Sequence, residues 1–481
     1  MFKRNICFIT TCILTIVYCV YISTHIYNGY MATTYQQMSF SKTEYEGRDN
    51  FEDFSSKQAS FTPTIYQLTE EEEKQLSEKL NQASKNRKVI VIWGGFNRPE
   101  RTGNEMNRNC GYCSLVAKNN TRIVDSHTAA VVFTYRKVNS ATMPSKSLRR
   151  PDQLYIWLSG ESPSSLQQRS MNFTFETDRQ FNATMTLRGD SDIFYTYGNA
   201  FFSHHAVNKL FAKEYDGKFE NMLKVKTNHT IAIISNCIFS PAARIRIKII
   251  TEMSEYGLRI DKFGSCFNNT LERASHIEIL KSYKFYLAFE NSYHCKDYIT
   301  EKFFKIGLQN GVVPVVWGPK RDDYNRVAPP NSFIHVDDFS SLQELVSYLD
   351  FLDNNDEEYL KYFSWYLLPG EDMPNYGRQT AYCQICRIVN GINIDERFKP
   401  DFNSMNPKIP LFTNGTARRT ITEHMENVIY GREDIECLES DPDVFKNEKY
   451  KPLKYGSSQL YEVNNYTNGL HKTINQLENA R

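Results

Sequence analysis

No charge of one sign dominates this chain, in which 57 Lys and Arg residues stand against 56 Asp and Glu residues. Basic residues form short pairs such as Arg149-Arg150 and no longer basic run. A surface with balanced charge has no net electrostatic attraction for a polyanion. The composition therefore argues against nucleic acid as a partner.

The sequence also lacks a Gly-x-Gly-x-x-Gly loop, a Walker phosphate loop and a convincing internal repeat. The first two motifs hold dinucleotides and nucleoside triphosphates through glycine-rich backbone at the start of a helix. Their absence leaves a nicotinamide-dependent enzyme or a phosphate-loop NTPase without support.

Long apolar stretches are scarce as well, and the clearest one runs from Ile6 to Ile26. It has the ~20 residues that a membrane-spanning helix needs. Lys3 and Arg4 precede it, which places the N-terminus in the cytosol by the positive-inside rule. A cleaved signal peptide is the alternative, but the usual small-residue cleavage site is missing. We predict a cytoplasmic tail over residues 1–5, a transmembrane signal anchor over 6–26 and a lumenal body.

Asn-x-Ser/Thr sequons downstream of the anchor agree with a lumenal body, because such sites are glycosylated on the lumenal side. They stand at Asn119, Asn172, Asn182, Asn228, Asn268, Asn414 and Asn465. We expect these asparagines to carry N-linked glycans.

Of the 11 cysteines, Cys7, Cys12 and Cys19 lie in the predicted anchor and the others fall in an oxidising compartment. Two close pairs have a spacing that also suits a structural zinc ion. The lumenal setting favours disulfides, whose pairing the sequence leaves open. The disulfide candidates are Cys110, Cys113, Cys237, Cys266, Cys383 and Cys386.

Residues 27–86 are polar with little apolar periodicity, which is typical of a stem. Within them the acidic stretch Glu70–Glu73 can open a short helix. Ordered folding should begin at Lys88, where a run of apolar residues starts.

Short apolar runs bounded by turn residues predict buried strands beyond Lys88. They cover residues 89–93, 129–133 and 154–158, and then 230–235, 260–263, 284–289, 312–317 and 333–336. Helix-like stretches at 242–256, 300–309 and 341–349 alternate with the second series. This alternation predicts two doubly wound parallel sheets, an α/β fold. We place the two domains at 87–220 and 221–390, followed by a C-terminal extension over 391–481.

Ligands of open parallel sheets collect at the carboxyl ends of the strands, so a nucleotide-sugar site is expected there. One predicted strand delivers Glu290 and Asn291 to its carboxyl end, and a helix begins near Thr300. The amides of that helix and Lys302 would face one point, which suits a diphosphate. A solvated Glu-Lys pair at a helix start is the simpler alternative.

The order of these residues is specific: Phe-Glu-Asn at 289–291, Tyr-Ile-Thr-Glu-Lys at 298–302 and Val-Pro-Val at 313–315. It resembles the signature of the alpha-1,3-fucosyltransferase family. Further segments agree in the same order. They are Gly160-Glu161-Ser162-Pro163, Phe181-Asn182-Ala183-Thr184-Met185, Asp190-Ser191-Asp192-Ile193, Ser235-Asn236-Cys237 and Ala243-Arg244-Ile245-Arg246. The resemblance covers about residues 88–390.

The resemblance implies two Rossmann-like domains of the GT-B type, with an acceptor domain first and a GDP-fucose domain second. It implies an inverting single displacement with GDP-fucose as donor substrate, no essential cofactor and a divalent cation that at most stimulates. It also implies a single-pass type II protein of the Golgi membrane with a lumenal catalytic part.

Individual residues carry over from the family's motif. Glu161 matches the general base, although a helix or turn cap is the alternative for a lone Glu before Ser-Pro. Arg244 and Lys302 match residues that hold the diphosphate, while we interpret Arg246, two positions on, as structural. Further donor-binding positions are matched by Glu301, Asn291, Tyr298 and Tyr286, and more loosely by Ser235, Asn236 and Tyr197.

Acidic pairs offer a rival interpretation, because metal-dependent glycosyltransferases hold a divalent ion with Asp-x-Asp. Asp190 and Asp192 fit this pattern, and Asp322-Asp323 and Asp337-Asp338 fit it loosely. Such pairs are common by chance, and the first lies in a family segment that the resemblance does not connect with metal. We therefore predict no metal site.

The resemblance implies transfer of L-fucose from GDP-fucose to the GlcNAc of glycoprotein N-glycans, at the core or the antennae. Cys295 departs from vertebrate Lewis-type members and resembles invertebrate and plant-like ones, several of which modify the innermost GlcNAc. The tail after about residue 390 is longer than the usual family end. The alternative is a catalytically inactive glycosyltransferase fold that binds glycans or acts as a chaperone. The presence of Glu161, Arg244, Glu301 and Lys302 argues against it.

Overall fold

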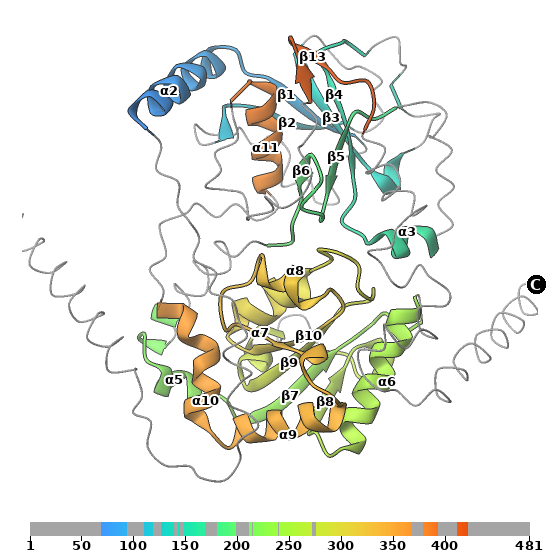
Figure 1. Cartoon of the computed structure of the whole chain (residues 1–481), viewed down its shortest axis with the longest axis vertical. Helices are drawn as coiled ribbons and strands as arrows, with labels where there is room; N and C mark the ends of the chain where they lie inside the picture. Colours follow the sequence, from blue (N-terminus) through green and yellow to red (C-terminus); the bar gives the residue numbers. More distant parts are fainter. Residues whose placement is uncertain are drawn as a thin grey trace, which may run out of the picture. The chain divides into compact units, whose positions relative to one another are not determined.

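A computed structural model of the chain describes residues 69–93, 110–118, 127–138, 143–144, 149–168, 180–198, 211–213, 215–238, 240–271, 276–367, 379–392 and 411–421. These residues form two parallel β-sheets with helices packed against them, so the predicted α/β fold is confirmed (Figure 1). The anchor predicted over 6–26 lies outside them. No helix among the described residues has the length and apolar character that crossing a bilayer requires.

The first sheet has the strand order β2-β1-β3-β4-β5-β6, and every neighbouring pair is parallel. Its strands are β1 (Val89–Trp93), β2 (Ser114–Lys118), β3 (Thr128–Thr134), β4 (Leu154–Leu158), β5 (Ala183–Thr186) and β6 (Ile193–Phe194). The three predicted runs form its centre. Because both faces of this centre are buried, residues of either parity are apolar, which explains the unbroken runs in the sequence.

Successive residues of these strands point to opposite faces and enter two separate cores. Ile90, Val132 and Ile156 pack on one face with the helix α11 (Gln379–Val389). Val91, Val131 and Tyr155 pack on the other, together with Leu166 of α3 (Pro163–Gln168).

The helix α11 corrects the domain boundary predicted at residue 390. Its residues Tyr382, Ile385 and Val389 belong to the core of the first sheet, although they follow the second sheet in the chain. Disulfides Cys110–Cys383 and Cys113–Cys386 fix it there, each joining residues 273 positions apart. The chain therefore returns to the first sheet before residue 390, because the apolar face of α11 is buried against it.

The close pairs Cys110/Cys113 and Cys383/Cys386 are therefore joined by disulfides that run from one pair to the other. The structural zinc ion considered as an alternative for these cysteines is wrong. Cys237 and Cys266 form a third disulfide. All six disulfide candidates are paired in the structure.

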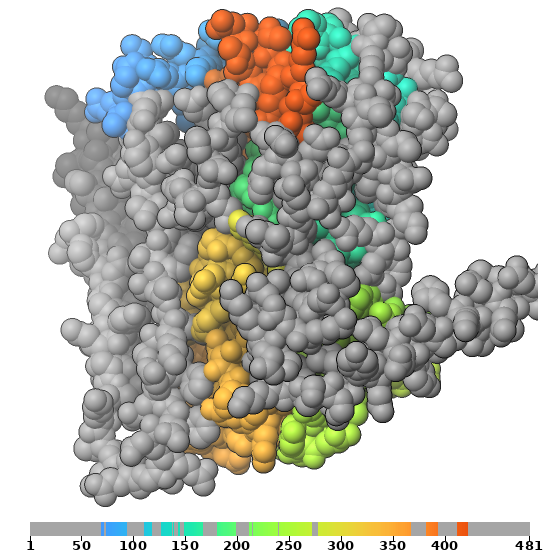
Figure 2. All heavy atoms as spheres, turned by 45° about the vertical axis from the view of Figure 1, so that its right-hand side comes forward, coloured from blue at the N-terminus to red at the C-terminus, as the bar shows by residue number. Residues whose placement is uncertain are grey.

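The second sheet has the order β11-β10-β9-β7-β8, again parallel throughout. Its strands are β7 (Asn228–Ile233), β8 (Ile260–Phe263), β9 (Tyr283–Phe289), β10 (Val313–Trp317) and β11 (Ile334–His335). The helix α6 (Pro241–Glu255) begins with the side chain of Ser240 accepting a hydrogen bond from the Ala243 amide and with Pro241 in its first turn. The helix α9 (Leu342–Asp353) is capped by Ser341 in the same way. Figure 2 shows residues of α6, in yellow-green, adjoining those of α9, in orange, at the surface.

Further helical segments complete the described chain. They are α2 (Glu70–Lys85), η3 (Tyr135–Lys137), α5 (Phe219–Lys224), η6 (Ser265–Phe267), α7 (His276–Lys281), η7 (Lys302–Gly307), η8 (Leu308–Asn310), α8 (Arg321–Asn325), η9 (Val336–Asp338), α10 (Asp356–Leu360) and η10 (Lys361–Leu367). The helix expected at Glu70 is therefore present, and it is long enough to bury Leu80 and Ala83. The stem predicted over 27–86 thus ends in a helix with buried apolar side chains.

The other predicted boundary, at residue 220, also lies too late. The ring of Phe211 packs against Phe219 of α5 at 4.8 Å and against Tyr366 of η10 at 5.2 Å between centroids. Aromatic packing of this kind buries large apolar area. Residues 211–220 therefore belong with the second sheet.

Part of the C-terminal extension packs on the first sheet as a hairpin of β12 (Phe412–Thr413) and β13 (Thr416–Ala417). The Ala417 amide donates to the Pro151 carbonyl at 2.8 Å. Arg418 donates to the Asn182 carbonyl at 2.7 Å and pairs with Asp192 at 2.6 Å. The segment 411–421 is thus part of the fold.

Asn182 corrects one predicted glycosylation site. Its side chain is fully buried, accepts a hydrogen bond from the Tyr155 amide at 2.7 Å and donates to the Gln153 carbonyl at 3.1 Å. An amide that is enclosed and bonded at both ends cannot carry a glycan in the folded protein. Asn228, Asn268 and Asn414 are exposed, and Asn119, Asn172 and Asn465 lie outside the described residues.

Candidate active site

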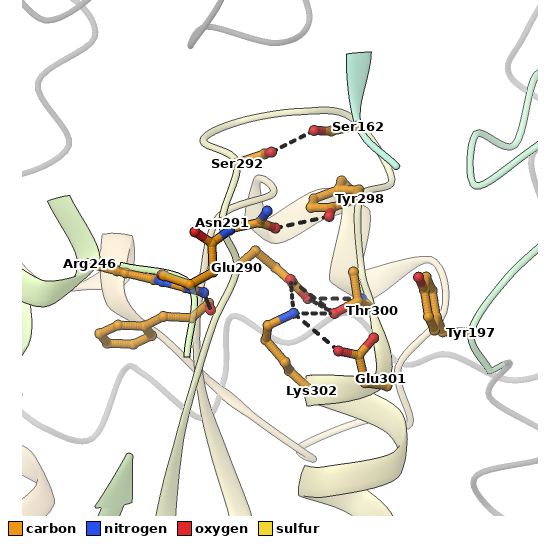
Figure 3. A network of polar contacts seen from close by, with 12 residues as sticks. Ser162, Tyr197, Arg246, Glu290, Asn291, Ser292, Tyr298, Thr300, Glu301 and Lys302 are labelled. Atoms are coloured by element: carbon orange, nitrogen blue, oxygen red, sulfur yellow. Dashed lines mark hydrogen bonds and ion pairs between the residues drawn. The ribbon is translucent and has the colours of Figure 1, made fainter. Parts of the chain in front are cut away.

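The carboxyl end of β9 holds a buried carboxylate, Glu290, at the centre of a polar network (Figure 3). The amide and hydroxyl of Thr300 donate to Glu290 Oε1 at 2.9 and 2.7 Å. Lys302 Nζ donates to Glu290 Oε2 at 2.9 Å and to Thr300 Oγ1 at 2.8 Å. A buried charge is tolerated only when paired and hydrogen-bonded, and this network meets both conditions.

The backbone of the segment after β10 lies very close to Glu290. The Glu290 amide donates to the Trp317 carbonyl at 2.8 Å, which brings the ends of β9 and β10 together. Gly318 follows with φ +138°, and a Cβ on it would lie 2.7 Å from Glu290 Cβ. Only glycine fits there, in conformation and in space.

For Glu290 and for Lys302, burial and the charge of the ion-pair partner shift the pKa in opposite directions. Burial raises the pKa of Glu290, and the neighbouring ammonium of Lys302 opposes this rise. Burial lowers the pKa of Lys302, but the carboxylates of Glu290 and Glu301 outweigh it and leave the pKa raised. Lys302 therefore remains a cation at neutral pH. It opens the π-helical turn η7, and such turns are frequent at functional sites.

Two predicted donor-binding residues, Tyr298 and Asn291, border this network, and a third, Tyr286, lies earlier on β9 (Figure 3). The Tyr298 hydroxyl donates to Asn291 Oδ1 at 2.9 Å. Burial raises the pKa of both tyrosines, and the charges of Glu290 and Glu301 raise it further. Both phenols therefore stay neutral donors in the physiological range.

Arg246, which the sequence analysis interprets as structural, lies beside them. It is buried, and its guanidinium donates to the Phe289 carbonyl at 2.8 Å and to the Asn236 carbonyl at 2.7 Å. It thereby ties the end of β9 to the loop between β7 and α6.

Glu161 lies in the loop between β4 and α3. Arg136 donates to its Oε1 at 2.9 Å and the Tyr135 hydroxyl does so at 3.2 Å. The Glu161 side chain is 19% exposed, so one oxygen is held while the group stays open to solvent. Its charge raises the pKa of Tyr298, after burial and the charge of Glu290. Glu161 therefore acts electrostatically on Tyr298, in the loop that follows β9.

Three other predicted residues make further contacts: Tyr197 packs against the cluster that holds Tyr298, and Arg244 and Ser235 bond to neighbouring loop carbonyls and hydroxyls. Arg244 donates to the Ile238 carbonyl at 2.7 Å. Ser235 is exposed, and its carbonyl accepts from the Ser265 hydroxyl at 2.9 Å. The Tyr197 hydroxyl donates to the Gly160 carbonyl at 3.4 Å, next to Glu161.

The Asp-x-Asp pair is bound by arginines. Asp190 pairs with Arg188 at 2.6 Å, and Asp192 pairs with Arg418 at 2.6 Å. Each carboxylate thus has its own guanidinium partner. Among the described residues, no group of three or more His, Cys, Asp or Glu side chains could hold a metal ion.

Sequence reasoning did not assign a role to Glu290, Thr300, Arg136 or Ser292. The sequence places Glu290 at a strand end, directly after an apolar run, but does not predict its bonds to Thr300 and Lys302. Arg136 gave no signal, since a single basic residue after β3 is common on any surface.

Two segments match the sequence profiles of one enzyme family. Residues 85–198 match "Fucosyltransferase, N-terminal" and residues 223–405 match "Glycosyltransferase family 10 (fucosyltransferase) C-term". Among solved structures, the chain aligns with "Crystal Structure of alpha1,3-Fucosyltransferase with GDP-fucose" at a TM-score of 0.41 and 16% identity, covering 63% of this chain and 90% of that one.

Characterised relatives agree with the profiles. Human 4-galactosyl-N-acetylglucosaminide 3-alpha-L-fucosyltransferase FUT6 is 36% identical over 312 residues, which are 62% of this chain and 77% of the relative. 3-galactosyl-N-acetylglucosaminide 4-alpha-L-fucosyltransferase FUT3 from Pan troglodytes is 38% identical over 224 residues, 46% of this chain and 54% of the relative. With both profiles and this similarity in agreement, the chain belongs to glycosyltransferase family 10 and is a glycosyltransferase of the fucosyltransferase type.

Proposed function

We propose that this enzyme transfers L-fucose from GDP-fucose to a GlcNAc hydroxyl of glycoprotein N-glycans, forming an alpha-1,3 linkage with inversion. The relatives' names describe 3-alpha- and 4-alpha-L-fucosyl transfer to galactosyl-N-acetylglucosaminides. The acceptor is the core or an antenna of the glycan.

The observation that carries the proposal is the partly buried cation Lys302, held beside the buried Glu290 at the end of β9. Lys302 has firm contacts to Glu290 and Thr300 and a longer one, 3.5 Å, to Glu301. A diphosphate oxygen can replace the longer contact while the two firm ones keep the ammonium in place. A charge-assisted bond to a phosphate is stronger than a neutral one, so this position favours a nucleoside diphosphate sugar.

In the proposed reaction, Glu161 removes the proton of the acceptor hydroxyl as its oxygen attacks the anomeric carbon of fucose. The bond from that carbon to the GDP oxygen breaks, and its electron pair leaves with GDP. Lys302 and Arg244 stabilise the charge that develops on the diphosphate. The products are the fucosylated glycan, GDP and the protonated carboxyl of Glu161.

The same proposal includes a reaction without an essential metal and a Golgi location. The carboxylates of the Asp-x-Asp pair are held by Arg188 and Arg418, which leaves them ill suited to a divalent ion. The anchor predicted over 6–26 and the sequons other than Asn182 support a single-pass type II protein with its catalytic part in the lumen.

Purified protein from residue 62 onward tests the proposal. It is incubated with GDP-fucose and a panel of core and antennal N-glycans, with and without a chelator, and the products are read by mass spectrometry. We expect one deoxyhexose added to a GlcNAc and undiminished transfer with chelator. A folded protein that binds the glycans but transfers nothing would favour the inactive glycan-binding alternative.

A further inference from the structure

Four buried serines connect the loop that carries Glu161 to the loop that follows β9. Ser292 is fully buried, and its Oγ lies 2.5 Å from Ser162 Oγ (Figure 3). Ser164 donates to Ser292 Oγ at 3.2 Å, and Ser165 Oγ lies 3.5 Å from it. Ser292 thus joins three hydroxyls of one short segment, residues 162–165.

Hydrogen bonds on both sides of Glu161 fix the position of its backbone. Ser162 is the next residue, and its Oγ accepts a hydrogen bond from the Ser165 amide at 3.2 Å at the start of α3. On the other side, Ser159 Oγ accepts from the Glu161 amide at 3.1 Å. A shift of Ser162 would therefore move the Glu161 backbone, while Tyr135 and Arg136 hold only its side chain.

The loop that carries Ser292 also carries the donor-side residues. Asn291 precedes it, and residues 297–302 follow. Asp297 in this loop accepts from the Gly189 amide at 3.0 Å, and Tyr298 packs with Leu187. The loop is therefore bonded to the segments beyond β4 and β5 of the first sheet at more than one point.

We propose that Ser292 is a positioning residue that links the donor-side loop to the Glu161 segment and so sets where the general base stands. The inference rests on the proposed function. A serine hydroxyl has one donor and two acceptor sites, and the three neighbouring hydroxyls of Ser292 can use all of them, next to Asn291. Misplacing a catalytic group by about 1 Å can cost up to ~10²-fold in rate, so a small shift of Glu161 is measurable.

The test compares Ser292→Ala with Ser332→Ala. Ser332 is a matched control, because it is equally buried and its hydroxyl donates to the Pro329 carbonyl at 2.6 Å, away from the serine cluster. Both variants should lose a similar amount of thermal stability. We expect Ser292→Ala to lower kcat about 10-fold, with the Kd of GDP within about twofold of wild type, and Ser332→Ala to turn over normally.

Two results would overturn the inference. One is equal turnover of the two variants; the other is a parallel loss of kcat and GDP affinity in Ser292→Ala, which would mean damage to the donor side. If Ser292→Ala does not fold, Ser162→Ala is judged by the same criteria. Glu161→Gln is measured alongside to separate the two hypotheses. Normal turnover of Glu161→Gln refutes the assignment of Glu161 as the base. Loss of turnover in Glu161→Gln, together with normal turnover of Ser292→Ala, refutes only the positioning role.

Discussion

Glu290 and Lys302 form an ion pair in which Glu290 is buried and Lys302 is partly buried, so Glu290 would be a buried charge without its partner. Removing one partner of such a pair costs about 3–5 kcal/mol when the remaining charge stays. Here the loss is eased, because burial already raises the pKa of Glu290 and a lone Glu290 can take up a proton. Variants of Lys302 should therefore fold well enough for binding to be measured.

We predict that Lys302→Ala weakens GDP binding, since a diphosphate loses a charge-assisted bond worth roughly 1.5–3 kcal/mol, or about 10- to 150-fold in Kd. Calorimetric titration with GDP measures the effect. Lys305→Ala is the control, because Lys305 is exposed on the same helical turn. Wild-type GDP affinity in folded Lys302→Ala would show that Lys302 does not bind the diphosphate.

The buried Lys226 makes the free energy of unfolding depend on pH. Its Nζ is buried and donates to the Tyr283 carbonyl at 3.0 Å and to the Gly311 carbonyl. Burial, together with the charges of Lys281 and Lys284, lowers its pKa from an ordinary value of 10.5 to about 7. Between these two values the unfolded chain binds a proton that the folded protein does not. The contribution of Lys226 to the free energy of unfolding therefore rises with pH across this window.

The prediction is that the free energy of unfolding of wild type relative to Lys226→Met increases above pH 7, by at most about 1.4 kcal/mol per pH unit. Urea unfolding at pH 7, 8 and 9 provides the values. Lys305→Met should show no such slope. A difference between wild type and Lys226→Met that is constant over this range contradicts a lowered pKa for Lys226.

Among the helices and strands, the sequence predicted those that follow from a local pattern of apolar residues. The apolar runs of β1, β3, β4, β9 and β10 are buried on both faces, so their pattern is unambiguous. β2, β5 and β6 were missed because they are short or contain polar residues, as in Ala183–Thr186. Their pairing with neighbouring strands, and not their own propensity, makes them strands.

The return of α11 to the first sheet could not be predicted. Its apolar face shows that it packs on something, but the partner is decided by contacts with residues far away in the chain. The disulfides at Cys383 and Cys386 fix that partner, and their connectivity does not follow from cysteine spacing. For the candidate site the same holds: the residues on β9 were found from one local motif, whereas Arg136 and Ser292 came into view only with the tertiary structure.

The burial of Asn182 between β4 and β5 predicts that this sequon carries no glycan. Its buried amide bridges the backbone at the start of β4, so the sequon should remain unmodified in secreted protein. Glycopeptide mapping should find Asn182 bare, whereas exposed Asn228, Asn268 and Asn414 are accessible to modification. Asn182→Ala should lower the melting temperature without lowering glycan mass. A glycan on Asn182 in active protein would refute the buried bridge.

For the whole molecule, we predict that residues 62–481 behind a signal peptide are secreted as a glycosylated, active enzyme. This fragment keeps α2, whose Lys79 donates to the Gly391 carbonyl at 2.9 Å, and omits the predicted anchor. Fucosyl transfer in the medium and a mass decrease after glycosidase treatment are the readouts. A matched fragment from residue 87 lacks α2 and should be less stable. Folded but inactive 62–481 would show that catalysis needs residues before 62.

The central claim is that Glu161 takes the acceptor proton while the end of β9 binds the donor. Turnover and GDP affinity of Glu161→Gln, measured on one preparation together with its melting temperature, test this claim most directly. The amide keeps the shape of the side chain but is a negligible base, so turnover should fall by ~10²–10⁴ while the Kd of GDP stays within about twofold. Turnover within a few-fold of wild type, with a lowered melting temperature, would instead identify Glu161 as a structural residue and contradict the account.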